Sequence, residues 1–413
     1  MRILLSTYGS RGDVEPMAAL AAALQALGAE AVVSAPPDEE FVDLLARAGV
    51  PLAPAFTPVR EWIEAAKKRS ADGIPQHAAR MIGAQYEAIG AAAGGCDAIL
   101  ATGLMPSAAA ARCVAETRGV PYVHASFCPL FLPSHLHQPF PYPGHPHPPG
   151  VTDNRVLWDL NIGAMNALFG AAVNGHRASI GLPAVDNVRD HVFTDHPFLA
   201  SDPILWPWLP TDLCDAVQTG AWILPDDRSL PADLEAFLEA GAPPVYVGFG
   251  SIALPSTRDA ARTAIEAARA QGRRVVLARG WVEAAPIDDR DDVFLIGDVN
   301  QQALFPRMAA VVHHGGAGTT TTATRAGAPQ VIVPQIVDQP WWAARVAGLG
   351  VGVAHDGPAP TFGSLSAALE TALAPEVRAR AAAVSATIHT DGATAAAKLL
   401  LDAISREGSR KPG

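Results

Sequence analysis

Residues 310–319 read Ala-Val-Val-His-His-Gly-Gly-Ala-Gly-Thr, an apolar run followed by two histidines and a glycine-rich turn. Residues 320–326 continue as a short helix that ends at Gly327 and Pro329. A strand, a glycine-rich turn and a helix in this order bring free backbone N–H groups and the positive end of a helix to one point. The stretch therefore predicts a phosphate-binding turn in an α/β fold.

This turn differs from two common nucleotide-binding patterns. It lacks the lysine of the GxxxxGK loop, and it is not a GxGxxG turn followed by a ribose-binding acid. Mononucleotide kinases and dehydrogenases are therefore disfavoured. His313 is expected to hydrogen-bond an oxygen of a diphosphate that carries leaving-group charge; the alternative is a histidine that only closes the hydrogen bonds of its strand.

Strand and helix patterns alternate along both halves of the chain. Residues 3–5 form an apolar run that leads into Gly-Ser-Arg-Gly-Asp at 9–13, and apolar residues then recur at helical spacing, with Asp13 as the expected N-cap. The alternation restarts with strands at 245–248 and 274–277. The pattern predicts two Rossmann-like halves, each a parallel sheet with helices on both faces.

The boundary between the halves is expected near residue 215, because residues 204–231 are rich in Pro, Asp and Trp and contain no long periodic element. We expect an N-terminal domain over 1–214 and a C-terminal domain over 215–392. A final helix with a short polar tail, over 393–413, is expected to cross back to the N-terminal domain.

Residues 129–149 contain eight prolines, which exclude a regular helix or a central strand. The helical pattern resumes at 156–172, so the segment is expected to be a binding loop of a compact domain. Its aromatic residues Phe131, Phe140 and Tyr142 offer flat apolar faces to an aromatic ligand.

The composition restricts the class of protein. The 30 Lys and Arg against 41 Asp and Glu give a formal charge of −11, which argues against binding nucleic acid through a basic surface. The N-terminus lacks a signal-peptide pattern, and no uncharged apolar stretch of 18 residues occurs. We expect a soluble, cytoplasmic, monomeric protein without membrane insertion.

The cysteines and histidines give little indication of a metal site. The four cysteines show no CxxC spacing, and reduced thiols are expected. The histidine pairs 135/137 and 145/147 have no carboxylate or cysteine spaced to complete a tetrahedral ligand set. No bound metal is expected.

Four short motifs carry a resemblance to a known family. Gly-Ser-Arg-Gly-Asp at 9–13, Gly-Phe-Gly-Ser at 248–251, residues 313–319 and Asp-Gln-Pro at 338–340 resemble, in order and spacing, the GT-B nucleotide-sugar glycosyltransferases of bacterial natural-product pathways. Two further segments are similar almost letter for letter to the enzymes that glycosylate vancomycin-group glycopeptide antibiotics: residues 217–225 and 352–358. The resemblance covers essentially the whole chain. It implies two Rossmann-like domains that face each other across a deep cleft, the first for the acceptor and the second for the donor.

The resemblance also implies an activity. The family transfers a hexose, with inversion and without a metal, from a UDP- or dTDP-sugar to a hydroxyl of a glycopeptide aglycone or pseudoaglycone. Asp13 matches the general base, although a plain N-cap role is the alternative. The helix dipole would favour its ionised form but lower its basicity. No cofactor besides the nucleotide-sugar co-substrate is implied, and the aromatic loop would contact the acceptor.

Individual donor contacts follow from the same resemblance. Asp338 and Gln339 would bind the hydroxyls of the donor hexose, and Trp281 and Val299 would lie near the nucleobase. Arg11 has an alternative as a surface cation paired with Glu15. Residues 341–342 are Trp-Trp, where the family usually has smaller aromatic residues, so the shape of the sugar pocket stays open. The residues expected at the diphosphate are Ser10, Arg11, Ser251, His313, Gly315, Gly316, Ala317, Gly318 and Thr319.

Other functions remain open at this point. A nucleotide-sugar 2-epimerase would share the two-domain architecture and the phosphate turn but would not need the proline-rich loop. A non-catalytic partner of another transferase would be expected to have lost the base or the donor motif, and both are present. A transferase acting on another aromatic or polyketide product is a further alternative. The sequence does not decide between UDP and dTDP.

Overall fold

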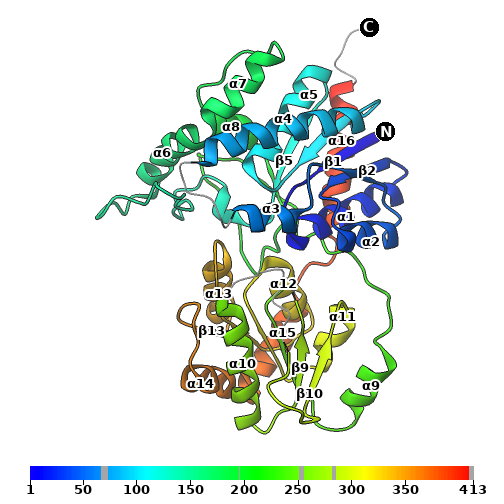
Figure 1. Cartoon of the computed structure of the whole chain (residues 1–413), viewed down its shortest axis with the longest axis vertical. Coiled ribbons are helices and arrows are strands. Elements are labelled where there is room, and N and C mark those ends of the chain that lie inside the picture. The colour runs from blue at the N-terminus through cyan, green and yellow to red at the C-terminus, as the bar shows by residue number, and fades with distance from the viewer. Residues whose placement is uncertain (67–72, 195, 251–254, 281–284, 409–413) are drawn as a thin grey trace. The chain divides into compact units, whose positions relative to one another are not determined.

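The computed structural model describes residues 1–66, 73–194, 196–250, 255–280 and 285–408 (Figure 1). The chain forms two compact units. The first unit consists of Met1–Ser201, Trp208–Leu224 and Thr390–Gly413, and the second of Asp202–Pro207 and Pro225–His389. The boundary expected at residue 215 thus lies within a segment that packs with the first unit.

The first unit is built on a parallel sheet. Within the described residues its seven strands lie in the order β3-β2-β1-β4-β5-β6-β7. Strands β2 and β3 are added on one side of β1, and β4 to β7 on the other, so the strand order switches between β1 and β4. The strands are β1 (Arg2–Ser6), β2 (Glu30–Ala35), β3 (Leu52–Pro54), β4 (Ala98–Ala101), β5 (Tyr122–Ser126), β6 (Phe198–Leu199) and β7 (Val217–Gln218). Because parallel strands need crossover connections, helices cover the sheet.

These helices include a turn of π-helix, η3 (Asn166–Gly170), between α6 and α7. The last helix of the chain, α16, belongs to this unit together with the N-terminal residues. The helices are α1 (Arg11–Ala26), α2 (Glu39–Arg47), α3 (Val59–Ala66), α4 (Ile74–Ala92), α5 (Met105–Arg118), the 3₁₀ turn η2 (Pro129–Phe131), α6 (Asn154–Met165), α7 (Ala171–Ser179), α8 (Val188–Phe193) and α16 (Gly392–Gly408).

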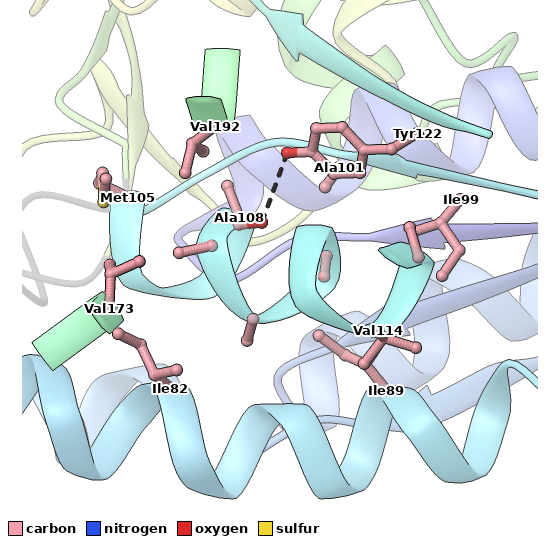
Figure 2. Packing of buried hydrophobic residues seen from close by; sticks show 14 of the residues in the cluster. Ile82, Ile89, Ile99, Ala101, Met105, Ala108, Val114, Tyr122, Val173 and Val192 are labelled. Carbon is pink, nitrogen blue, oxygen red and sulfur yellow. Dashed lines mark hydrogen bonds between the residues drawn. The ribbon is translucent and has the colours of Figure 1, made fainter. Parts of the chain in front are cut away.

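Small side chains let helix α5 pack closely in this core. Its alanines at 108–111 are all buried, and alanine combines high helix propensity with little bulk. Figure 2 shows Ile82 and Ile89 of α4 on one side of α5 and Ile99 of β4 on the other. The Tyr122 hydroxyl donates a hydrogen bond to the Ala108 carbonyl, 3.4 Å away, which ties α5 to β5.

The second unit repeats the architecture with a six-stranded parallel sheet in its described residues, in the order β10-β9-β8-β11-β12-β13. The strands are β8 (Val245–Gly248), β9 (Val275–Ala278), β10 (Val293–Ile296), β11 (Ala310–His313), β12 (Gln330–Ile332) and β13 (Gly352–Ala354). The helices are α9 (Ala232–Glu239), α10 (Pro255–Ala270), α11 (Gln301–Leu304), the 3₁₀ turn η4 (Phe305–Arg307), α12 (Ala317–Arg325), α13 (Gln339–Gly348), α14 (Phe362–Ala372) and α15 (Pro375–Ser385). Two Rossmann-like parallel sheets are therefore present, as the alternating pattern predicts.

One helical stretch meets a simple test for a membrane span. Among the described residues, Asn154–Ser179 has the required length and a mean hydropathy of 1.3, and half of the tested window is buried in the structure. A helix in the core of a folded domain passes the same test, so this stretch is weak support for a span.

A buried ionic cluster joins α5, α7 and α8. Arg177 is 2% exposed, and its Nη1 lies 2.7 Å from Oε2 of Glu116. Oε1 of Glu116 lies 2.9 Å from both Nε of Arg112 and Nε2 of His191. Burial raises the pKa of Glu116, but the hydrogen bond from Arg177 and the nearby positive charges outweigh it, so that the pKa is lowered overall.

Glu116→Gln is expected to destabilise the first unit at pH 7 by about 3 kcal/mol, because the Arg177 guanidinium stays buried without its counter-ion. A carboxylate whose pKa is lowered by folding stabilises the fold fully when the pH is above its pKa in the unfolded chain. This contribution is lost as the pH falls through its lower pKa in the folded protein. The difference between the two proteins should therefore shrink below about pH 4. Urea unfolding monitored by hydrogen exchange at several pH values measures both the loss of stability and its dependence on pH. The exposed Glu87→Gln change is the control, and an equal loss there would contradict this assignment.

Candidate active site

Asp13 lies in the first turn of α1, but not at the position expected for it. The N-cap is Ser10, and the helix begins at Arg11, so the prediction of Asp13 as N-cap was wrong. Asp13 instead occupies the third helical position, where its Oδ2 accepts a hydrogen bond from the Ser10 backbone N–H at 2.8 Å. This is one half of a capping box, in which an acidic side chain satisfies an amide before the helix. The carboxylate is therefore held in place by the backbone.

The approach of this carboxylate depends on Gly9. A Cβ added to Gly9 would lie 2.1 Å from Oδ2 of Asp13, which no side chain can tolerate. Arg11, expected at a diphosphate, has its Nε 2.7 Å from Oε2 of Glu15, one helical turn further on. The alternative of a helix-surface ion pair is thus present in the structure.

In the second unit, loops that follow neighbouring strands meet at the carboxyl edge of the sheet. Gly250, after β8, has φ of +60°, and a Cβ there would lie 2.8 Å from Cε1 of His314, after β11. Gly280, after β9, has φ of +56°, and its Cβ would lie 2.8 Å from the Gly250 carbonyl oxygen. Glycine fits such positions because it lacks a Cβ and adopts positive φ freely. Open α/β sheets bind their ligands at this edge.

His313 is fully buried at the end of β11, and both of its ring nitrogens are engaged. Nδ1 accepts the Gly315 backbone N–H at 3.1 Å, and Nε2 lies 3.0 Å from the side-chain oxygen of Gln330. The Gln330 amide nitrogen in turn donates to Oγ1 of Thr324. Burial lowers the pKa of His313 to about 3, so the ring is neutral. With these contacts the ring has no N–H left for a phosphate.

His314 differs from its neighbour in this respect. Its side chain is 9% exposed, and its Nδ1 is buried without a hydrogen-bond partner. Its Nε2 lies 2.5 Å from the position of a Cβ on Gly316, so the ring lies against the glycine turn. Burial lowers the pKa of His314 to about 4. The sequence does not single out His314, because two adjacent histidines give no reason to prefer the second.

The glycine turn leads into a helix N-terminus without a side-chain cap. Helix α12 begins at Ala317, three residues earlier than expected, with Gly316 as N-cap. Ala317, Gly318 and Thr319 therefore form its first turn, where backbone N–H groups have no acceptor within the helix. Gly316, the N-cap, has no side chain to bond these amides, so within the described residues this helix end is suited to an anion.

The expected sugar-binding pair lies beside this turn. A Cβ on Gly315 would lie 3.2 Å from the backbone oxygen of Gln339, so the two loops touch. The side-chain oxygen of Gln339 accepts the backbone N–H groups of Gln335 and Ile336, at 2.8 and 3.0 Å. Asp338 is the N-cap of α13, and its Oδ2 accepts the indole N–H of Trp342 at 2.8 Å.

Backbone strain precedes this pair. Val337 has φ of +54°, in the left-handed region that a β-branched residue rarely adopts. Strain of this kind typically costs about 1–3 kcal/mol and is concentrated at functional sites. The sequence contains no signal for it, because nothing distinguishes this valine from those of the strands.

The segment expected at the nucleobase is held by Asn300. The Asn300 amide donates 2.8 Å hydrogen bonds to the carbonyls of Asp226 and Arg228, and its oxygen caps Ala303. The neighbouring Val299 is half-buried. Ser251 and Trp281, expected at the phosphate and the base, lie outside the described residues.

The proline-rich loop of the first unit is anchored at defined points. The Asn154 amide donates to the His135 carbonyl, and the Trp158 indole N–H donates to the His137 carbonyl, both at 2.9 Å. A cavity of about 150 Å³ lies between the loop and α6.

The three aromatic residues of this loop form a continuous row. Phe140 makes edge contacts with Phe131 and Tyr142, at ring distances of 6.1 and 5.6 Å. Tyr142 continues the row to Phe169 of the core, at 6.2 Å. Tyr142 therefore packs the loop onto the domain, and both Phe140 and Tyr142 line the cavity.

Among the described residues, no group of three or more His, Cys, Asp or Glu side chains is placed to hold a metal ion. The first histidine pair of the loop, 135/137, has other contacts. His135 lies 3.1 Å from Oγ1 of Thr211, and His137 lies 3.1 Å from the Leu132 carbonyl oxygen.

Comparison with known proteins supports this architecture. Residues 283–397 match the family described as Erythromycin biosynthesis protein CIII-like, C-terminal domain. The crystal structure of the glycotransferase of kitacinnamycin is 22% identical, covers 97% of each chain and has a TM-score of 0.71. The two parallel sheets thus form the GT-B fold.

Full-length relatives are considerably more similar in sequence. Vancomycin aglycone glucosyltransferase of Amycolatopsis orientalis is 53% identical over 98% of each chain. dTDP-epi-vancosaminyltransferase of the same organism is 50% identical over 100% of each chain. Identity of this extent, together with the two parallel sheets, shows that the chain belongs to the glycosyltransferases of the vancomycin-group glycopeptide antibiotics.

Proposed function

We propose that this chain is an inverting, metal-independent glycosyltransferase that moves a hexose from a UDP- or dTDP-sugar to a hydroxyl of a glycopeptide aglycone or pseudoaglycone. The observation that carries the proposal is the uncapped N-terminus of α12 behind the Gly315–Gly316 turn. It offers backbone N–H groups to a diphosphate beside the Asp338 and Gln339 pair. The names of the two relatives support a glycopeptide acceptor and leave both donor nucleotides open.

In the proposed step, the acceptor oxygen forms a bond to the anomeric carbon while the bond from that carbon to the diphosphate oxygen breaks. The acceptor proton passes to the Asp13 carboxylate, and the electron pair of the broken bond stays on the nucleoside diphosphate. A single displacement inverts the anomeric centre. The capping contact with Ser10 supports this role because a base must be held in a fixed geometry.

The diphosphate charge is met by the first amides of α12 and by the His314 imidazole. The unpartnered Nδ1 of His314 supports this assignment, and the engaged nitrogens of His313 make that residue a support for the turn. Preorganised donors of this kind stabilise charge that develops in the transition state without a metal ion. Asp338 and Gln339 are assigned to the hydroxyls of the donor hexose.

The acceptor is assigned to the proline-rich loop. Phe131 and Phe140 are half-buried, and their edge contact keeps a flat apolar surface in one orientation. Proline restricts the loop in the unbound state and so reduces the entropy lost on binding. Tyr142 supports this surface from the core side.

The reaction itself is tested by incubating the enzyme with UDP-glucose or dTDP-glucose and vancomycin aglycone, in EDTA. The α-linked donor should give a β-linked product, identified from the coupling of its anomeric proton in NMR, and turnover should not change on chelation. An α-linked product, or activity that returns only with added metal, would refute the mechanism. Epimerised nucleotide sugar in the absence of acceptor would favour the 2-epimerase alternative.

Asp13→Asn separates the base from the cap. The amide oxygen can still accept the Ser10 N–H, so the melting temperature should change little, while kcat should fall roughly 10²- to 10⁴-fold through loss of the base. Affinity for UDP or dTDP should stay within about twofold. Asp13→Ala, which removes both roles, should lower kcat and the melting temperature together. If Asp13→Asn retains full kcat, Asp13 is only a capping residue.

His314→Ala should lower kcat/KM for the nucleotide sugar roughly 10- to 100-fold, the usual effect of losing one hydrogen bond to a charged group. The matched change His313→Ala should mainly lower the melting temperature, because it leaves the Gly315 N–H and the Gln330 amide unpaired. Steady-state kinetics and thermal denaturation of both variants compare the two roles. Unchanged donor kinetics in His314→Ala would show that the backbone amides bind the phosphate without it.

A further inference from the structure

The indole of Trp342 contacts the carboxylate that the proposed function places at the donor sugar. Its Nε1 donates a 2.8 Å hydrogen bond to Oδ2 of Asp338, and the side chain is 1% exposed. We propose that Trp342 is a positioning residue, whose N–H fixes the Asp338 carboxylate in the orientation that recognises the donor hexose. The inference rests on the sugar-binding role of Asp338 proposed above.

The helix alone would orient this carboxylate differently. Asp338 is the N-cap of α13, where an aspartate normally accepts a hydrogen bond from the second or third helical amide. Asp338 makes no such bond, and its backbone carbonyl, not its side chain, accepts the amides of Trp341 and Trp342. Pro340 removes another amide from the first turn. The indole of Trp342, one turn further along, therefore holds the carboxylate away from the helix end.

The indole is itself held from outside the helix. Trp206 meets it edge to face, with ring centroids 5.2 Å apart and planes at 86°. Trp206 belongs to the segment Asp202–Pro207, which packs with the second unit although the residues on both sides of it belong to the first. Nε of Arg345 on α13 donates to the Leu205 carbonyl at 2.6 Å. The segment thus fixes both the helix and the ring.

The segment has an anchor of its own. Asp202 is fully buried, and its Oδ1 accepts the backbone N–H groups of Ile204 and Leu205. Its Oδ2 accepts the N–H of His389 at 2.8 Å. The segment that carries Trp206 is therefore itself hydrogen-bonded within the second unit.

A fixed carboxylate has a specific consequence for the donor. Because Oδ2 accepts the indole N–H, the plane of the carboxylate is restrained, which sets its orientation toward the hydroxyls of the hexose. Loss of the N–H would remove this restraint on the carboxylate, which should weaken binding of the sugar while the nucleoside diphosphate keeps its own contacts. The sugar and the nucleotide should therefore respond differently to the same substitution.

The test compares Trp342→Phe with Trp206→Phe. Both changes remove the same atoms from one aromatic pair, but only Trp342→Phe removes the N–H that donates to Asp338. We expect Trp342→Phe to weaken binding of UDP-glucose or dTDP-glucose roughly tenfold by calorimetry, to raise the donor KM similarly, and to leave the affinity for UDP or dTDP within twofold. Trp206→Phe should change sugar binding less than threefold. Replacing Trp342 by benzothienylalanine, which keeps the bicyclic ring without an N–H, should reproduce the Trp342→Phe effect without its cavity.

Asp338→Asn separates failure of this inference from failure of the proposed function. If Asp338→Asn leaves donor binding unchanged, the sugar-binding role of Asp338 is wrong. If Asp338→Asn weakens sugar binding but Trp342→Phe behaves like Trp206→Phe, or the benzothienylalanine variant binds sugar normally, the positioning role is overturned. The double variant Asp338→Asn with Trp342→Phe should be no weaker in sugar binding than Asp338→Asn alone, because both changes act through one carboxylate. Additive losses would contradict the proposal.

Discussion

The second unit depends on how closely its backbone segments approach one another at the carboxyl edge of the sheet. Gly250, Gly280 and Gly316 lie where a single methyl group would overlap a carbonyl oxygen or the ring of His314. This packing lets the loops after β8, β9 and β11 meet at one point, which a sheet with larger residues there would not allow. The uncapped end of α12 and the Gln339 loop border the same point. A site for a charged ligand follows from missing side chains as much as from those present.

Buried hydrogen bonds distinguish the two neighbouring histidines of the turn. Hydrogen bonds run from Gly315 through His313 and Gln330 to Thr324. They satisfy buried donors and acceptors whose loss of a partner would destabilise the fold. They fix the path of the turn and leave His314 as the histidine with an unpaired nitrogen. The two adjacent histidines thus differ, because both ring nitrogens of His313 have partners whereas Nδ1 of His314 has none.

In the first unit, the Asp13 carboxylate combines a structural contact with a proposed catalytic role. One carboxylate completes the cap of α1 and is the residue we propose as the base, and Gly9 permits both by leaving room for it. The positive φ of Val337 and the contact of Trp206 with Trp342 lie outside the glycine turn, in the segments that support the Asp338 and Gln339 pair. Stability and recognition are therefore coupled at several positions, which makes matched pairs of substitutions more informative than single ones.

The sequence by itself determined the two parallel-sheet halves, because apolar periodicity and the glycine turns act over a few neighbouring residues. It determined the apolar run that forms most of β11, and it placed the N-termini of α1 and α12 three residues from where they lie, since helix ends depend on caps that several residues can supply. The tertiary structure alone decided which histidine keeps a free nitrogen, because Gln330 reaches His313 from the next strand. It also brought Trp206 against Trp342, across 136 positions of sequence, and no local pattern encodes a contact of that range. Local chemistry fixed the elements, and side chains from distant segments fixed which groups of the site remain free to bind.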